Sequence, residues 1–377
     1  MGHRFDWILR SEKICERPYR TTWEGSRIWV GANPDSGGYI SRTLSMLSHV
    51  LHEFKIFRLA KSDDYNIVQV KDRFLISVIG LLAARSAKKK FVFWLSFDYA
   101  EDDKQRAMAS TGLSSVILRA RSAYIRFLLA HVIAPKSDHI FVQSSRMKED
   151  LINLGAESRK ITPVPMGVDR NKVIESNEIE INKNCICYLG TLSRTRKIEF
   201  LIDVLVHIKK IIPDAYLLLV GSGQLPGDEE FLRTYAKESS VEDSVEITGQ
   251  LPQNKAWERV QSAAVCVSPF EPTPSLISCS PTKLVEYMAL GKASVANDIP
   301  DQKDLLENSG GGRCVRYDVT EFSDAIVDLL SNPDVTKEMG CMARDYILAH
   351  RTYDRLAILV EDAYRRLLAD NATISER

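Results

Sequence analysis

The 377-residue sequence predicts an α/β protein built from two Rossmann-like domains, each with a doubly wound parallel sheet. Short apolar segments alternate with helical patterns almost throughout, which is typical of parallel sheets covered by helices on both faces. The apolar segments are rich in Val, Ile and aromatic residues and lack two-residue alternation, as expected for strands buried on both faces. They fall into two series, which a polar segment without periodicity at 167–184 divides.

The chain length supports this division, because a domain takes roughly 150 residues. We expect an N-terminal domain over 1–167, a second domain over 168–350, and a C-terminal helix over 351–377 that packs back toward the first domain. Hydrophobic residues make up 45% of the chain, as in an ordinary soluble protein. The longest apolar run, at 74–84, is too short to span a bilayer.

The predicted elements follow in chain order. The strands of the first series are 4–9, 26–31, 65–70, 90–95 and 139–144. The strands of the second series are 185–190, 215–221, 245–249, 264–269 and 293–298. Helices lie between them, for example at 37–53, 72–87, 114–133, 199–211, 227–238, 253–262, 281–290 and 321–330, and the end at 352–370 is an amphipathic helix. After the first strand we expect a polar loop, SEKICERPYRTTWEGS, where a doubly wound domain normally has a helix.

Charge is unevenly distributed although the net charge is zero. Residues 1–165 hold 26 Lys and Arg against 17 Asp and Glu, and the remainder holds 24 against 33. A basic first half favours an anionic partner or a membrane surface, while a chance distribution of charge explains it equally well. The seven Cys are odd in number and scattered, which predicts reduced thiols and a cytoplasmic protein, with peripheral contact to the inner membrane face left open.

The predicted helix at 281–290 carries the first candidate site. Ser280 and Pro281 form a favourable helix start, and Gly291 a natural stop. Its N-terminus offers free backbone N–H groups and a positive dipole end near the carboxyl ends of the strands, which favours a phosphate. Glu286 could accept both hydroxyls of a ribose. The alternative is an ion pair with Lys283, one turn earlier on a solvated face.

A basic loop and a glycine-rich turn follow two other strands. The strand that ends at Gly190 leads into Arg194, Arg196 and Lys197, and such cations can clamp a diphosphate. The alternative is an ordinary basic surface loop. The segment GSG, which ends at Gly223, lets the backbone approach a ligand closely at a strand end, although a single G-x-G is weak evidence.

The order of these elements resembles the retaining glycosyltransferase family 4, which has the GT-B fold. The resemblance covers about 65–350 and is carried by YLGTLSRTRKIEFLIDV, LLLVGSG, VEITGQLP and SPTKLVEYMALGKASVANDIPDQ. It implies two Rossmann-like domains facing across a cleft. It further implies a nucleotide diphosphate sugar as donor on the second domain, and a glycan or lipid-linked acceptor on the first. No cofactor besides the donor is implied, and nucleic acid binding has no support in the sequence.

The resemblance also assigns roles to individual residues. Glu286 matches the acid that holds the donor ribose, and Arg196 and Lys197 match the basic pair on the diphosphate. The remaining donor contacts expected are Gly190, Arg194, Gly223, Gln250, Leu251, Ser278, Ser280 and Lys283. Ser278 stands where the family often has a second glutamate, and Thr191 where it often has an arginine. No catalytic histidine is identifiable near Ser96–Asp98.

The sequence contains no Asp-x-Asp pair, which argues against a metal-dependent GT-A enzyme. We therefore expect a metal-free site in which cations and a helix N-terminus neutralise the leaving diphosphate. By the resemblance, a leaving phosphate oxygen deprotonates the acceptor hydroxyl on the same face, so the reaction retains configuration. The alternatives are another GT-B enzyme, such as a sugar-nucleotide 2-epimerase or a phosphorylase, and a catalytically silent nucleotide-sugar-binding protein; the phosphorylase lysine motif is not seen.

Three further features remain open. Against the family, MGHRFDWILR aligns with the second strand, so we expect the first strand, its glycine-rich loop and the first helix to be absent. The helix around 113–138 places Arg119, Arg121 and Arg126 among apolar residues and is either a membrane-contacting helix or an ordinary core helix. His49 and His52 are an incidental pair rather than a metal site.

Overall fold

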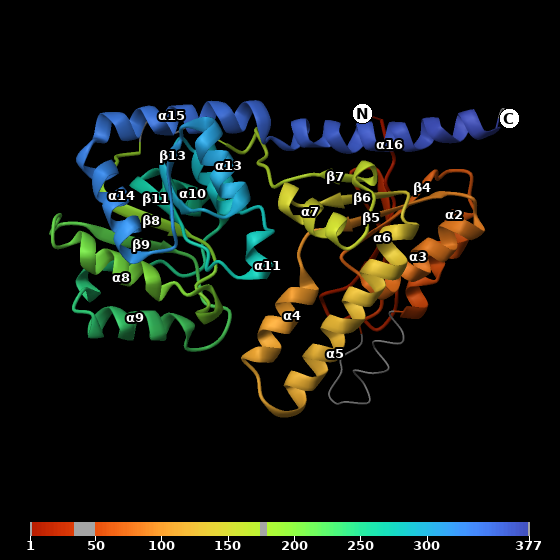
Figure 1. The fold of residues 1–377 in the computed structure, drawn as a ribbon, viewed down its shortest axis with the longest axis horizontal. Helices are drawn as coiled ribbons and strands as arrows, with labels where there is room; N and C mark the ends of the chain where they lie inside the picture. Colours follow the sequence, from red (N-terminus) through yellow and green to blue (C-terminus); the bar gives the residue numbers. More distant parts are fainter. Residues whose placement is uncertain (1, 34–49, 174–178, 376–377) are drawn as a thin grey trace. The chain divides into compact units, whose positions relative to one another are not determined.

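The computed structural model describes residues 2–33, 50–173 and 179–375, with side chains described as far as 369 (Figure 1). The chain divides into two compact units. The first comprises Met1–Val142, Lys148–Thr162 and Val360–Arg377, and the second comprises Gln143–Met147 and Pro163–Leu359. In the described residues, no helix is long and apolar enough to cross a membrane.

The second unit contains one six-stranded sheet. Its strands are β8 (Asn182–Leu189), β9 (Tyr216–Val220), β10 (Val245–Ile247), β11 (Ala263–Ser268), β12 (Ser294–Asn297) and β13 (Gly312–Val315). They pair in parallel in the order β10-β9-β8-β11-β12-β13. This is the Rossmann order, in which the chain reverses its direction of progress between the two central strands. The predicted parallel α/β fold is confirmed, and the switch point lies between β8 and β11.

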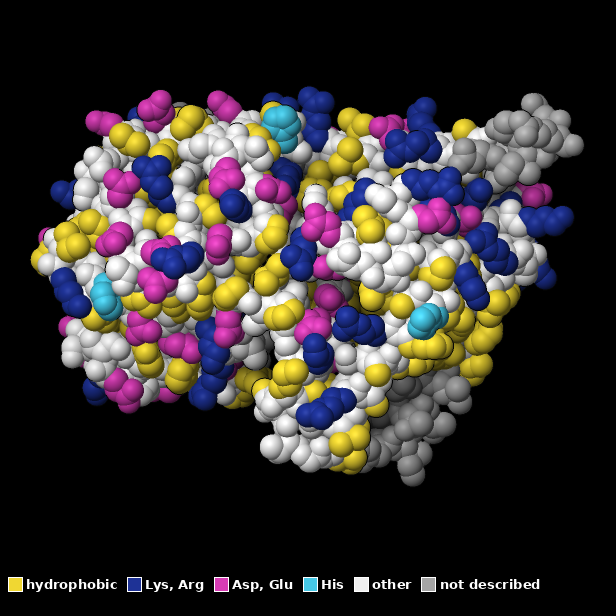
Figure 2. Space-filling view, viewed as in Figure 1, with side chains coloured by type: hydrophobic (Ala, Val, Ile, Leu, Met, Phe, Trp, Pro, Cys, Tyr) yellow, Lys and Arg dark blue, Asp and Glu magenta, His cyan; other side chains and the backbone are white. Residues whose placement is uncertain are grey.

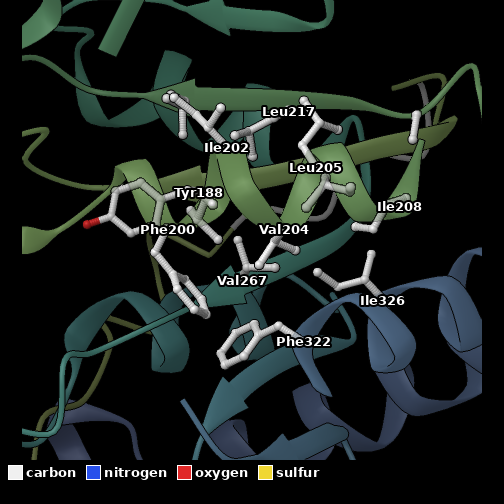
Figure 3. Packing of buried hydrophobic residues seen from close by; sticks show 14 of the residues in the cluster. Tyr188, Phe200, Ile202, Val204, Leu205, Ile208, Leu217, Val267, Phe322 and Ile326 are labelled. Atoms are coloured by element: carbon white, nitrogen blue, oxygen red, sulfur yellow. The ribbon is translucent and has the colours of Figure 1, made fainter. Parts of the chain in front are cut away.

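Helices cover this sheet and build the core of the second unit. They are α8 (Glu199–Ile208), α9 (Asp228–Glu238), α10 (Gln253–Gln261), α11 (Pro274–Ile277), α12 (Thr282–Ala289), α13 (Pro300–Ser309), α14 (Val319–Ser331) and α15 (Pro333–His350). Leu201, Leu205 and Ile208 recur at helical spacing on the buried face of α8. Figure 3 shows this face against the sheet, with Phe322 and Ile326 of α14 on the same core. Each such burial stabilises the unit by about 1.5–3 kcal/mol.

The first unit contains two sheets in its described part. The larger has four strands in the order β4 (Ile67–Lys71), β5 (Lys90–Leu95), β6 (His139–Val142) and β7 (Ile161–Pro163). The smaller has the order β1 (Trp7–Arg10), β3 (Ser26–Gly31) and β2 (Tyr19–Trp23). β1 runs parallel to β3, and β2 runs antiparallel to it.

Strand β2 lies where the sequence predicted a polar loop, so that prediction was wrong. β2 joins β3 through Glu24 and Gly25, which both have positive φ angles, 48° and 78°. A two-residue hairpin turn of type I′ requires two such angles, and glycine adopts them at low cost. The Glu-Gly pair was therefore the overlooked signal. Because β2 is exposed along its whole length, its residues lack the apolar pattern of the other strands.

The helices of the first unit are α2 (Lys55–Ala60), α3 (Phe74–Ser86), α4 (Tyr99–Met108), α5 (Gly112–Leu128), α6 (Ala134–Lys136), α7 (Ser145–Asn153, which starts in the second unit) and the later part of α16 (Tyr353–Ser375). A π-helical turn at Leu129–Ile133 joins α5 to α6. Most of the helix expected at 37–53, including His49, lies outside the described residues. From Val360 onward α16 packs on the first unit, where Tyr364 Oη donates to Gln69 Oε1 at 2.5 Å.

Candidate functional site

The candidate site lies at the switch point of the six-stranded sheet. Gly190 follows the carboxyl end of β8, and Phe270 follows the carboxyl end of β11. Open α/β sheets bind ligands in the crevice outside this edge, between the strands where the order reverses. The backbone of Phe270 is fixed there, because its N–H donates to Asn297 Oδ1 at 2.8 Å and its carbonyl accepts from Nδ2 at 2.9 Å.

Lys283, in the first turn of α12, reaches this edge. Its Nζ donates to Tyr188 Oη at 2.7 Å and lies 4.0 Å and 4.8 Å from the ring centroids of Tyr188 and Phe270. A Cβ added to Gly190 would lie 3.5 Å from the same Nζ, so this strand end must approach the ammonium closely. Lys283 Nζ is therefore held at the switch point. The ion pair between Lys283 and Glu286, which was the alternative reading of the sequence, does not form.

Arg196 shares the Phe270 ring with Lys283. Its guanidinium carbon lies 5.8 Å from the Phe270 centroid. Among the described residues, neither cation forms an ion pair with a carboxylate. Burial lowers the pKa of Lys283 well below its usual value, the charge of Arg196 lowers it further, and Glu286 opposes the shift. Two cations without an acid partner at a strand edge favour an anionic ligand. We call Arg196 and Lys283, which share the Phe270 ring, the cation pair.

The other two cations of the predicted basic loop do not join this pair. Arg194 lies 4.6 Å from the Phe231 ring centroid and 3.9 Å from Asp228 Oδ1, both on α9. Lys197 ends a short 3₁₀ turn with a left-handed φ of 53°, and its side chain is exposed. The loop was expected to bring three cations to one ligand; in the structure Arg194 and Arg196 lie against different rings, those of Phe231 and Phe270.

The glycine-rich turn after β9 is held by acids of α9. The Gly223 N–H donates to Glu229 Oε1 at 3.3 Å, and the N–H groups of Gln224 and Leu225 donate to Asp228 Oδ2 at 3.0 Å. In the neighbouring loop, Gln250 Oε1 accepts from Ser222 Oγ at 3.1 Å. Leu251 packs against a buried cluster that includes Trp257. The structure therefore gathers Gly223, Gln250 and Leu251 beyond the ends of β9 and β10.

Glu286 lies one turn after Lys283 on α12 and is partly buried. Burial raises the pKa of its carboxyl group, while Trp257, Gln253 and the charge of Lys283 oppose the rise. Within the described residues, the buried Trp257 Nε1 has no hydrogen-bond partner. Sequence reasoning missed both α10 residues, although their position in the predicted helix at 253–262 was correct. Their proximity to Glu286 depends on tertiary packing.

The two serines before α12 are used within the protein. Ser280 Oγ donates to Asp301 Oδ2 at 2.6 Å and accepts from the Met166 N–H at 2.9 Å. The predicted Ser280 cap is therefore wrong: the helix begins at Thr282 after Pro281 without a side-chain cap, because a buried carboxylate captures the hydroxyl. Ser278 is also buried, and its carbonyl accepts from Ser144 Oγ at 2.6 Å.

Other candidate groups lie elsewhere. Ser96 donates its backbone N–H to Asp72 Oδ1 at 2.7 Å, and Asp98 caps α4 by accepting from the Glu101 N–H at 2.9 Å. His52 is buried beside the Trp29 carbonyl and Lys55 Nζ. Within residues 2–33, 50–173 and 179–375, no three His, Cys, Asp or Glu side chains gather closely enough to hold a metal ion.

Both halves of the chain match glycosyltransferase families. Residues 1–172 match the family described as Glycosyltransferase Family 4, and residues 183–332 match Glycosyl transferases group 1. An uncharacterised glycosyltransferase of Haemophilus influenzae is 27% identical over 183 residues, which are 47% of this chain and about half, 49%, of that protein.

Solved structures share the whole fold. Sucrose-phosphate synthase of Thermosynechococcus elongatus superposes with a TM-score of 0.72 at 17% identity, covering 98% of this chain and 90% of that one. The HepE protein of Anabaena, in complex with UDP, gives 0.65 at 13% identity, covering 97% and 100%. The two domains together define a GT-B protein. The chain belongs to the GT-B glycosyltransferases, with a family 4 first half and a group 1 second half.

Proposed function

We propose that the chain transfers a sugar from a nucleoside diphosphate sugar to a glycan or lipid-linked acceptor, with retention and without a metal ion. The cation pair at the switch point carries this proposal. A leaving diphosphate develops negative charge, and preorganised cations in a partly desolvated site stabilise such charge most effectively. The N-terminus of α12 adds unpaired N–H groups at the same edge.

The remaining residues suit the other parts of a donor. Glu286, one helical turn from the cation pair, is suited to accept the two ribose hydroxyls, and Gln250 and Leu251 are suited to flank a base. UDP bound to the HepE neighbour supports a nucleoside diphosphate, although that likeness is one of fold. Arg196 and Lys197 would neutralise the diphosphate, as the resemblance implies. In this proposal, the transfer to the acceptor is a step in polysaccharide or glycoconjugate synthesis.

The decisive experiment titrates nucleoside diphosphates and their sugars against the protein by thermal shift. Glu286→Ala should weaken binding of UDP or another ribonucleotide by roughly 10–100-fold, because charge-assisted hydrogen bonds are worth about 1.5–3 kcal/mol. Glu258→Ala is the matched control, since this exposed acid on α10 pairs with Lys255 on the surface of the same helix. A 2′-deoxynucleotide keeps only the 3′-hydroxyl, so Glu286→Ala should weaken its binding less than it weakens binding of the ribonucleotide.

Turnover separates the remaining alternatives. Transfer with NMR-detected retention, undiminished by EDTA, supports the proposal. Epimerised donor without transfer would indicate a sugar-nucleotide epimerase, and binding without any turnover would indicate a silent binding protein. If no nucleotide raises the melting temperature, the proposed donor site is wrong.

The proposal includes peripheral contact with the cytoplasmic membrane face through α5. This helix exposes large apolar side chains at Leu113, Val116, Ile117, Tyr124 and Phe127. Arg121 pairs with buried Asp103, and Arg126 lies 3.8 Å from Glu101, so α4 neutralises two of the three predicted arginines. Arg119 remains to contact anionic headgroups. Liposome flotation with Val116→Ser/Ile117→Ser tests this contact: unchanged flotation would exclude it.

A further inference from the structure

A basic pocket of about 610 Å³ lies within the first unit. Lys90 opens β5 and His139 opens β6, so the pocket lies at the amino ends of these strands. Its wall comes from α3, β5, α6, the start of β6 and α16, together with Arg159 and Lys160. A pocket of this size suits a small organic ligand. It lies at the opposite strand ends from those at which doubly wound sheets bind their substrates.

The pocket is strongly cationic. Six of its residues are Lys or Arg, and its one acid is Asp138. That acid is already used, because Asp138 Oδ2 accepts from Arg85 Nη1 at 3.0 Å and from the Phe91 N–H at 2.7 Å. It therefore compensates Arg85 and leaves the other cations of the wall without an acid inside the pocket. Figure 2 shows Lys and Arg side chains gathered over the first unit beside α16.

Three of these cations have no carboxylate partner anywhere in the described chain: Lys90, Lys136 and Arg366. They come from β5, α6 and α16, so the fold brings together charges that are far apart in sequence. Burial, together with the positive charges of Arg366 and Lys148, lowers the pKa of His139 to about 4. Collected like charges repel one another unless an anion lies among them.

The wall also has an apolar part. Leu81 and Leu82 of α3 and Leu367 of α16 face the same pocket as the cations. An inorganic ion alone would leave the exposed Leu82 in water, whereas a phosphate with an organic group would cover it and pack over the buried Leu81 and Leu367. We propose that this pocket binds a phosphate ester, with its phosphate among Lys90, Lys136 and Arg366 and its organic part against the leucines. A soluble metabolite and a phospholipid headgroup both carry this chemistry.

The test compares two triple variants with the same change in charge. Lys90→Gln/Lys136→Gln/Arg366→Gln removes the unpaired cations. Lys104→Gln/Arg106→Gln/Arg365→Gln is the control, because these residues lie in the first unit outside the pocket and pair with acids on the surface. Calorimetry measures binding of glycerol 3-phosphate and of inorganic phosphate. Co-sedimentation measures binding to phosphatidylglycerol vesicles against phosphatidylcholine vesicles.

The pocket variant should bind the effective probe at least about tenfold more weakly, since charge-assisted contacts are lost, while the control keeps wild-type affinity. Glycerol 3-phosphate as the effective probe identifies a soluble ester, and phosphatidylglycerol identifies a lipid headgroup. Equal loss in both variants, no loss in the pocket variant, or no binding of any probe at millimolar concentration overturns the proposal. An unchanged unfolding transition of the first unit verifies the fold of each variant, so the outcome is independent of the proposed transferase function.

Discussion

The two units use the same α/β construction but place their charged sites differently. In the second unit the sheet reverses its order between β8 and β11, and the cation pair lies at the carboxyl edge of that reversal. In the first unit the described strands of the larger sheet run in chain order from β4 to β7, without a reversal. Its concentrated positive charge lies at the amino edge.

The difference teaches that topology, rather than the number of basic residues, guides the choice of the proposed nucleotide site. The first half of the chain is the more basic one, yet its described sheet has no switch point. The units also differ in packing. The second unit has large buried clusters on both faces of its sheet, whereas β1 and β2 expose Trp7, Leu9, Tyr19 and Trp23.

The largest expected effect tests whether the second unit is a separate folding unit. Phe322 is fully buried and packs edge-on against Phe200 at 5.2 Å between centroids. Phe322→Ala should cost the second unit about 3–5 kcal/mol by leaving a cavity. Urea unfolding should show that only the transition protected by UDP moves. Phe141→Ala, a similarly buried position in the first unit, is the control and should move the other transition. A single common shift in both variants would contradict two independent units.

The next effect sharpens the contrast between two arginines of one loop. Arg196→Gln should lower kcat/KM by about 10²–10³, the usual cost of removing one preorganised charge-stabilising group. Arg194→Gln should have a much smaller effect, because Arg194 lies against Phe231 and Asp228. Steady-state transfer kinetics measure both variants under identical conditions. Equal losses of kcat/KM in the two variants would show that the loop rearranges on donor binding and that Arg194 acts together with the cation pair.

The sequence predicted the parallel sheets better than their edges. Long buried strands, such as Cys185–Leu189 within β8, have an apolar pattern that can be recognised in the sequence. The short strands β7 and β13 do not, and Gly310–Gly312 before Arg313 resembles a turn. Both were missed for that reason. Their pairing comes from neighbouring strands rather than from local preference.

The candidate site shows the same limit. Position along the chain correctly located Lys283 and Glu286 at the start of a helix near a strand edge. Helical spacing suggested that they pair, but Tyr188, from a strand far earlier in the chain, takes the ammonium instead. Likewise, the capping preference of serine predicted Ser280 as the N-cap of this helix, but the Ser280 hydroxyl donates to Asp301 instead. Partners that fold beside a residue cannot be read from its immediate sequence.

A smaller effect concerns pH at the cation pair. Burial and Arg196 lower the pKa of Lys283 in the free protein, and a bound diphosphate should raise it by favouring the charged ammonium. Donor binding should therefore take up a proton between these two pKa values, and affinity should fall there as pH rises, by at most about tenfold per pH unit. Calorimetry of UDP binding in two buffers of different ionisation enthalpy measures this uptake. Lys283→Met should abolish it, and its persistence there would assign it to another group.

The smallest expected effect tests how α16 stabilises the first unit. Tyr364 is buried and its ring lies 5.7 Å from that of Phe141, while its hydroxyl donates to Gln69. Burial raises its pKa to about 12, so it remains a donor at physiological pH. Tyr364→Phe keeps the ring contact and removes one buried hydrogen bond, at a cost of about 1 kcal/mol. The first-unit transition should shift by that amount, and hydrogen exchange should increase in α16 beyond Val360. Tyr353→Phe, on the exposed start of the same helix, should leave both unchanged. A shift of the UDP-protected transition instead would show that α16 stabilises the second unit, and the contrast between the two units would then require a different boundary.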